Sequence, residues 1–121
     1  SIAAYCALID KKYDKAARFF ELALSLNSWE EGDYARALFG RALLSYETSD
    51  FAKAWKQSGR VYILHRDQIY TPASLFLAMR AAVQLKRLND AKSVWKELKV
   101  RYPSYSNGNE VSTFAVKHVL D

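Results

Sequence analysis

The sequence predicts an all-α protein, an α-solenoid of antiparallel helix pairs. One observation is a repeated pattern in which an alanine is followed four residues later by a large aromatic residue, at Ala16 and Phe20 and again at Ala91 and Trp95. A related version surrounds Ala54. Similarity at a period between about 20 and 50 residues is the signature of solenoids and other repeat architectures. The other observation is that only two prolines and four glycines interrupt the chain, which favours long helices with short connections.

Length and composition indicate one folded domain spanning residues 1–121. The chain is 50% hydrophobic and 26% charged. A chain of this size buries roughly two-thirds of the surface that it exposes when unfolded. It contains no run of about 18 apolar residues that would predict a membrane span, and its start lacks the layout of a secretory signal. We therefore expect a soluble domain of the cytoplasm or the periplasm.

The residues that usually carry catalysis or metal binding are few and scattered. The single cysteine, Cys6, excludes an internal disulfide and a site built from several cysteines. Because alanines and Leu8 flank it, we expect a small buried thiol. His65 and His118 are isolated, and the sequence has no metalloprotease, nucleophile-elbow or phosphate-loop motif. The prediction is a protein that is not an enzyme and holds no cofactor or metal.

The chain divides into three predicted units, at roughly residues 1–30, 31–68 and 69–104, and a capping helix at 109–120. We expect the last helix to cover the third unit, because the ends of a solenoid need protection from solvent. The first helix has no capping residue before its apolar stripe, so we expect the chain to begin within a repeat. That stripe comprises Ile2, Ala3, Cys6 and Ile9.

The second and third helices follow from their spacing of apolar residues. The second is predicted at residues 13–27, with a buried face that comprises Ala16, Phe20, Ala23 and Leu24. The third is expected to begin between residues 28 and 34 and to end near Thr48. Thr48, Ser49 and Asp50 offer caps for the fourth helix. Gly59 lowers the helix propensity of that segment, and a close helix crossing would explain why it is tolerated.

Two prolines mark the later boundaries. Thr71 followed by Pro72 predicts the start of a fifth helix, capped by the threonine hydroxyl and running to about Arg87. The sixth is expected to open at Asn89 or Asp90 and to end before Pro103, because the residue before a proline is pushed out of helical geometry. Residues 105–109 read YSNGN, which predicts a turn.

These features resemble the tetratricopeptide repeat family, whose helix-turn-helix unit of 34 residues has an A-x3-F core and a closing proline. Ala16 and Phe20 match that core, and Pro103 lies where the closing proline belongs. The second unit departs from the pattern, with Ser58 in place of the aromatic residue and Arg66 in place of the proline. The spacing is also longer, since the key alanines are 38 (54 minus 16) and 37 (91 minus 54) residues apart.

One segment resembles a subfamily of these repeats from bacterial envelope assembly and cell-division accessory proteins. The segment is LNDAKSVWKELKVRYPSYS, in which a basic residue, a tyrosine and a proline close the unit. This resemblance implies a bacterial setting.

The family resemblance implies a protein-interaction scaffold, in which the first helices of the units line a concave groove that binds a peptide or a partner helix. Aromatic anchors mixed with a few charges are typical of binding hot spots. Trp29, in the turn after the first unit, is a second candidate anchor, although it could equally pack beside Tyr34. The candidate contact residues are Tyr5, Arg36, Phe39, Tyr46, Glu47, Phe76, Arg80, Gln84 and Trp29.

The family's clamp for a C-terminal carboxylate is not expected. That clamp uses lysine, asparagine and arginine side chains, because a carboxylate needs converging charged donors. The corresponding positions here are occupied by Ser1, Tyr5, Gly40, Ala73 and Leu77.

Nucleic-acid binding is the alternative from another class. The net charge is +5 (18 basic minus 13 acidic residues), and two helix faces carry basic stripes that could follow phosphates. The stripes comprise Lys53, Lys56 and Arg60, and Lys92, Lys96 and Lys99. By the repeat geometry both lie on the outer helices, where a solvated surface explains them as well. Self-association through the first helix also stays open, because three repeats are near the minimum for a stable stack.

Overall fold

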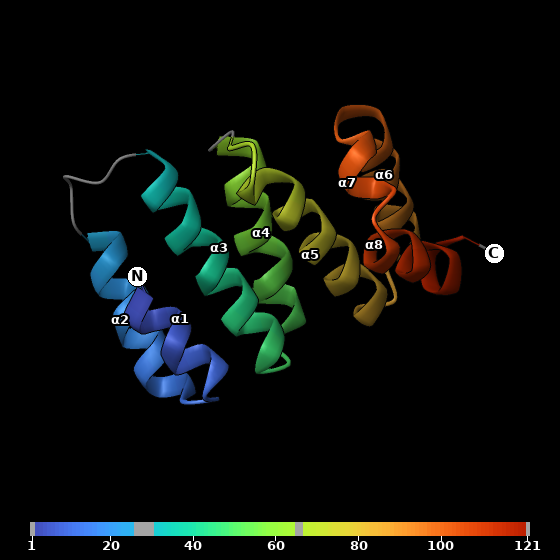
Figure 1. The fold of residues 1–121 in the computed structure, drawn as a ribbon. Helices are drawn as coiled ribbons and strands as arrows, with labels where there is room; N and C mark the ends of the chain where they lie inside the picture. The colour runs from blue at the N-terminus through green and yellow to red at the C-terminus, as the bar shows by residue number, and fades with distance from the viewer. Residues whose placement is uncertain (1, 26–30, 65–66, 121) are drawn as a thin grey trace.

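The computed structural model describes residues 2–25, 31–64 and 67–120, and within these ranges every regular element is a helix (Figure 1). Six longer helices come first: α1 (Ile2–Ile9), α2 (Tyr13–Ser25), α3 (Glu31–Glu47), α4 (Phe51–Leu64), α5 (Tyr70–Gln84) and α6 (Leu88–Arg101). Three short elements follow: α7 (Pro103–Ser106), α8 (Asn109–Phe114) and a π-helical turn, η1 (Ala115–Val119). None of the helices in these ranges has the length and apolar content needed to cross a membrane. The prediction of an all-α helical repeat is confirmed.

Each helix packs mainly against its neighbours in the sequence, so the helices follow one another in a row across the molecule (Figure 1). The first helices of successive pairs, α1, α3 and α5, also contact one another, whereas the second helices α2, α4 and α6 lie farther apart. A row whose first helices are closer together than its second helices curves toward the first helices. The exposed side of α1, α3 and α5 therefore forms the inner surface of the row.

The three helix pairs share one turn, which recurs at the spacing of the sequence repeat. In each turn a residue other than glycine has a positive φ: Lys11 (59°), Ser49 (65°) and Lys86 (63°). The next residue then donates its N–H to the carbonyl oxygen five residues earlier, which is the Schellman ending of a helix. These bonds join Lys12 to Ala7 (2.8 Å), Asp50 to Ser45 (2.8 Å) and Arg87 to Ala82 (2.9 Å).

The key alanines sit at one position in this turn. The carbonyl oxygens of Lys12, Asp50 and Arg87 accept the N–H groups of Ala16, Ala54 and Ala91, at 2.9, 2.9 and 3.0 Å. These bonds form the first turn of α2, α4 and α6, and each of the three alanines is fully buried. The repeat seen in the sequence is thus a repeat of backbone hydrogen bonding as well as of side-chain pattern.

The buried side chains form a smaller cluster at α1 and α2 and a larger one at the C-terminal end. In the larger cluster Val111, Ala115 and Val119 of the last helical segments pack with Leu75, Met79 and Leu98 of α5 and α6. Covering such a surface stabilises the fold through the removal of apolar area from water. The expected covering of the last pair is therefore present, although two short helical elements provide it.

The buried face of α1 differs from the predicted stripe. Cys6 is exposed, so the expectation of a buried thiol is wrong, and Ile9 is 77% exposed. The residues that face the core are Ala4, Ala7 and Leu8. Because α1 is apolar almost all round, its periodicity does not define which side is buried.

The boundary at Asp67 also differs from the prediction. The Thr71 hydroxyl does not cap the start of α5; instead it accepts the N–H of Asp67 at 2.7 Å. The Asp67 carboxylate accepts the N–H groups of Ile69 (2.9 Å) and Tyr70 (2.8 Å), so aspartate is the cap. The predicted cap at α4 is confirmed, since Asp50 Oδ1 accepts the N–H of Lys53 at 3.2 Å. The predicted turn at 105–109 is shorter, because Tyr105 and Ser106 belong to α7.

Candidate partner-binding groove

The predicted contact residues on the inner helices gather into two clusters. The first joins α1, α3 and the start of α5. The Tyr5 hydroxyl donates to the carbonyl oxygen of Arg36 at 2.6 Å, and the Tyr5 ring meets the Phe20 ring edge-on, with 5.3 Å between centroids. Phe39 packs against Tyr70 at 5.8 Å between ring centroids. These contacts hold neighbouring helices together, so Tyr5 is mainly a packing residue.

Burial changes the acidity of Tyr5. The pKa of its hydroxyl is raised well above its ordinary value, mainly because the surroundings exclude water and also because of Tyr70, while Arg36 opposes the shift. A phenolate at this position would have little solvent and an unfavourable carbonyl oxygen as neighbour. Tyr5 therefore stays a neutral hydrogen-bond donor throughout the physiological pH range.

The second cluster surrounds Arg80 on α5. The guanidinium carbon of Arg80 lies 4.4 Å from the ring centroid of Phe76 and 5.2 Å from that of Tyr46, so it is held between α5 and α3 by two cation–π contacts. Phe76 meets Phe114 of α8 edge-on at 5.7 Å, and Phe114 lies 4.7 Å from the His118 ring. The predicted residues Tyr46, Phe76 and Arg80 thus lie in one chain of contacts that reaches the C-terminal helices, and within it Phe76 is buried in the larger core cluster.

A pocket of about 420 Å³ opens beside this cluster. Its walls combine the rings of Phe76, Phe114 and His118 with charged and polar side chains. The complete lining is Phe76, Arg80, Asn109, Glu110, Thr113, Phe114, Lys117 and His118. Only Phe76 and Arg80 were candidates from the sequence. The remainder belongs to α8 and η1, to which the sequence pattern assigned a covering role and no contact with a partner.

Arg80 has one donor that stays unpaired inside the described part of the fold. Its Nε atom is buried and has no hydrogen-bond partner among the described residues. The pKa of the Tyr105 hydroxyl is raised, mainly by burial. Two charges of the pocket also act on it: Arg80 lowers this pKa and Glu110 raises it. A fixed cation between aromatic rings is suited to a ligand that brings a negative charge and an apolar group.

The other predicted contact residues do not join these clusters. Glu47 and Gln84 are exposed near the ends of α3 and α5. Trp29 lies outside the described residues. In the described part of the chain, no three histidine, cysteine, aspartate or glutamate side chains are arranged to hold a metal ion.

The two basic stripes lie on α4 and α6, as predicted, and their side chains are exposed. The Lys99 ammonium group lies 5.5 Å from the centroid of the Trp95 ring. Because α4 and α6 are second helices, these charges are on the side of the row opposite to Arg80.

Comparison with protein-family models, with curated proteins and with solved structures found no match. The geometry of the two clusters and of the pocket is therefore the basis for assigning a function.

Proposed function

We propose that this chain is a protein-interaction scaffold that binds a peptide or a partner helix along its inner surface, with Arg80 and the adjoining pocket as the main point of contact. The observation that carries the proposal is the position of Arg80, which two aromatic rings hold at the edge of a pocket of about 420 Å³. The resemblance to tetratricopeptide repeats supports the same surface, because that family binds partners along its first helices.

The physical basis is low ordering cost. An arginine on a flexible stem loses side-chain entropy when it binds, at about 0.5 to 1.5 kcal/mol for each immobilised side chain. Arg80 has already lost much of that freedom through its contacts with Phe76 and Tyr46. A ligand therefore meets a preformed cation and an apolar wall, which are the components of interface hot spots.

The test uses a library of displayed peptides selected on the purified chain, followed by affinity measurements on the selected sequences. Thr113 lines the pocket and is exposed, so Thr113→Trp fills the pocket without disturbing the core. Ser93→Trp, on the exposed side of α6, is the matched control. We expect the selected peptides to bind the parent and the Ser93→Trp variant equally and to lose most of their affinity for Thr113→Trp.

Two outcomes would overturn the proposal. One is the selection of peptides that bind the Thr113→Trp variant with the same affinity as the parent. These peptides would also bind a folded Arg80→Ala, Tyr46→Ala double variant with unchanged affinity. The other is recovery of nuclease-sensitive material from a lysate, with binding that falls steeply as salt rises. That result would assign function to the basic stripes of α4 and α6 instead.

A further inference from the structure

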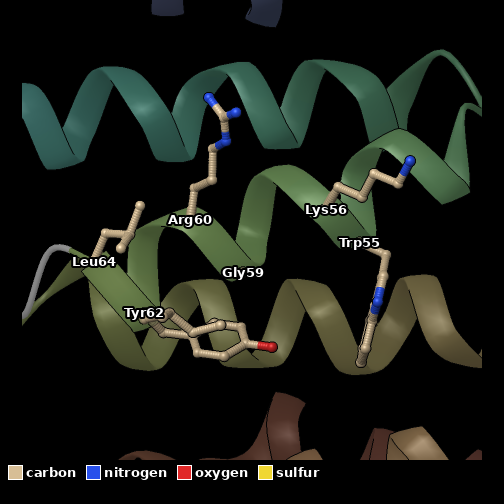
Figure 2. Close-up of a pocket in the computed structure, with 7 residues that line it drawn as sticks. Trp55, Lys56, Gly59, Arg60, Tyr62 and Leu64 are labelled. Carbon is tan, nitrogen blue, oxygen red and sulfur yellow. The ribbon is translucent and has the colours of Figure 1, made fainter.

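A separate groove lies on the outer side of the molecule, over Gly59 of α4 (Figure 2). It encloses about 360 Å³ and is lined by Trp55, Lys56, Gly59, Arg60, Tyr62, Ile63 and Leu64. Figure 2 shows Lys56 and Arg60 extending from one side of α4, and Trp55 and Tyr62 extending from the other side. Gly59 lies between the two sets of side chains. We call this feature the Gly59 groove.

The interior of the fold does not explain why residue 59 is a glycine. A Cβ atom built there would meet only Ile63 Cδ1 and Tyr62 Oη, both at 3.9 Å, which is an ordinary van der Waals distance. The predicted close helix crossing at Gly59 is therefore absent among the described residues. Glycine within a helix costs about 1 kcal/mol relative to alanine, and no packing contact with the residues that the structure describes offsets that cost. What the missing side chain does provide is the open floor of the groove.

The two walls of the groove differ in chemistry. One wall is cationic: Lys56 and Arg60 are exposed, are one helical turn apart, and form no ion pair or hydrogen bond with any residue that the structure describes. The other is apolar and is formed by Trp55 and Tyr62. Ile63 (67% exposed) and Leu64 (66% exposed, on the same side of α4 as Arg60) add apolar surface to the lining. The lining contains no acidic residue. A ligand that complements both walls carries negative charge beside an apolar side chain.

The aromatic residues of the groove are anchored from behind. Trp55 and Tyr62 are partly buried and pack against the larger core cluster. Their positions are set by α5 and α6, so the apolar wall is formed before any ligand binds. Rings that pack on a core have less surface for stacking nucleic-acid bases, which favours a peptide as the occupant.

We propose that the Gly59 groove binds an acidic amphipathic helix of another protein. An apolar side chain of that helix lies on the backbone at Gly59 and contacts Ile63 and Tyr62, while two carboxylates one turn apart reach Lys56 and Arg60. The absent Cβ lets the partner helix approach α4 closely, since helix axes pack about 8 to 10 Å apart depending on the side chains between them. This site is independent of the inner surface, so the chain can hold two partners at once.

The probes are two synthetic helical peptides that differ only in charge. Both carry leucine on one face; the first has glutamate at two positions one turn apart beside it, and the second has lysine at those positions. We expect the glutamate peptide, and not the lysine peptide, to bind the chain. Its binding should shift the indole N–H resonance of Trp55 in the nuclear magnetic resonance spectrum. That resonance is assigned by its loss in Trp55→Phe.

Variants of the groove separate binding from folding. Gly59→Leu fills the floor and improves helix propensity, so we expect its melting temperature to equal or exceed that of the parent while the affinity for the glutamate peptide falls at least about tenfold. Ile63→Glu provides a second test, because it adds a negative charge at an exposed position without reaching the core. Lys56→Glu with Arg60→Glu should abolish binding. Lys92→Glu with Lys96→Glu has the same spacing and charge change on α6 and should leave the affinity nearly unchanged.

Each contrary result decides against the proposal. It is wrong if Gly59→Leu and Ile63→Glu bind the glutamate peptide as the parent does, or if the lysine peptide binds equally well. It is also wrong if a single-stranded oligonucleotide binds this surface and neither peptide does, since the occupant is then a nucleic acid. The Thr113→Trp variant should retain the glutamate peptide, so failure of the inner-surface proposal is distinguishable from failure of this one.

Discussion

The ring of Phe20 on α2 lies directly against Gly40 on α3, where the first two helix pairs meet. A Cβ atom built on Gly40 would collide with the Cε1 and Cζ atoms of that ring, and it would lie 2.9 Å from the Tyr5 hydroxyl oxygen. Phe20 is fully buried. Because the ring is enclosed on all sides, it has no space into which to retreat.

Gly40→Ala should therefore destabilise the protein. We expect the free energy of unfolding to fall by about 1 to 3 kcal/mol, which is the usual cost of adding a group to a packed core. Urea unfolding measures it. Gly59→Ala is the matched control and should raise the free energy of unfolding by about 1 kcal/mol, because it improves helix propensity at a site with room for a methyl group. A Gly40→Ala variant as stable as the parent would contradict this account of the interface.

The contact between Phe20 and Gly40 also shows which part of the fold can be predicted from the sequence. Periodicity within one helix identifies its buried face, and Ala16, Phe20 and Ala23 of α2 are buried as predicted. The same pattern contains no information on which residue of the next helix receives the ring. That depends on the angle and distance between two helices, so Gly40 could not be assigned as the partner of Phe20.

The candidate site was predictable to a similar extent. The sequence pattern placed Tyr46, Phe76 and Arg80 on the first helices of the pairs, and the structure brings these three side chains together. Phe114 and His118 belong to the same surface but could not be named, because the C-terminal helices do not follow the repeat pattern. For α1, an almost uniformly apolar segment offered no polar side, and the prediction for Cys6 failed for that reason.

The shared turn leads to a second prediction, at Lys86. Its φ of 63° lies in the left-handed region, which costs a residue with a Cβ roughly 1 to 2 kcal/mol. Glycine avoids that strain but gains freedom in the unfolded chain, so the net effect of Lys86→Gly should be a rise of about 0.5 to 1 kcal/mol in the free energy of unfolding. Lys96→Gly, in the interior of α6, should lower it by about the same amount or more. If Lys86→Gly lowered the free energy of unfolding as Lys96→Gly does, the turn at Lys86 would not be strained.

Two buried serines, Ser45 on α3 and Ser58 on α4, should respond in opposite directions to removal of their hydroxyls. Ser58 Oγ is buried and has no hydrogen-bond partner among the described residues, whereas Ser45 Oγ donates to Gln57 Oε1 at 2.6 Å. We expect Ser58→Ala to be neutral or stabilising by up to about 1 kcal/mol, and Ser45→Ala to be destabilising by about 1 to 3 kcal/mol, because it leaves the buried Gln57 oxygen unpaired. Thermal unfolding of both variants under identical conditions measures the contrast. A loss of stability in Ser58→Ala larger than that in Ser45→Ala would reverse the assignment.

The alkaline stability of the fold should depend on Tyr5. Its pKa is raised in the folded state by burial, so the folded chain retains the phenolic proton at pH values where the unfolded chain, with an ordinary pKa of about 10, releases it. Folding stability is therefore unaffected by this group below about pH 9 and decreases as pH rises beyond 10, because the folded state then binds more protons than the unfolded state. Tyr5→Phe removes the contribution of this hydroxyl to the pH dependence.

At neutral pH the Tyr5→Phe variant should be less stable than the parent by about 1 kcal/mol, through loss of the hydrogen bond to the Arg36 carbonyl oxygen. Urea unfolding of both proteins between neutral pH and about pH 11 gives the difference in free energy at each pH. Since titration penalises only the parent, the difference should shrink steadily above about pH 10. A difference that stays constant across this range would mean that the Tyr5 hydroxyl reaches solvent in the folded protein, and that α1 is not held against α3 by this contact.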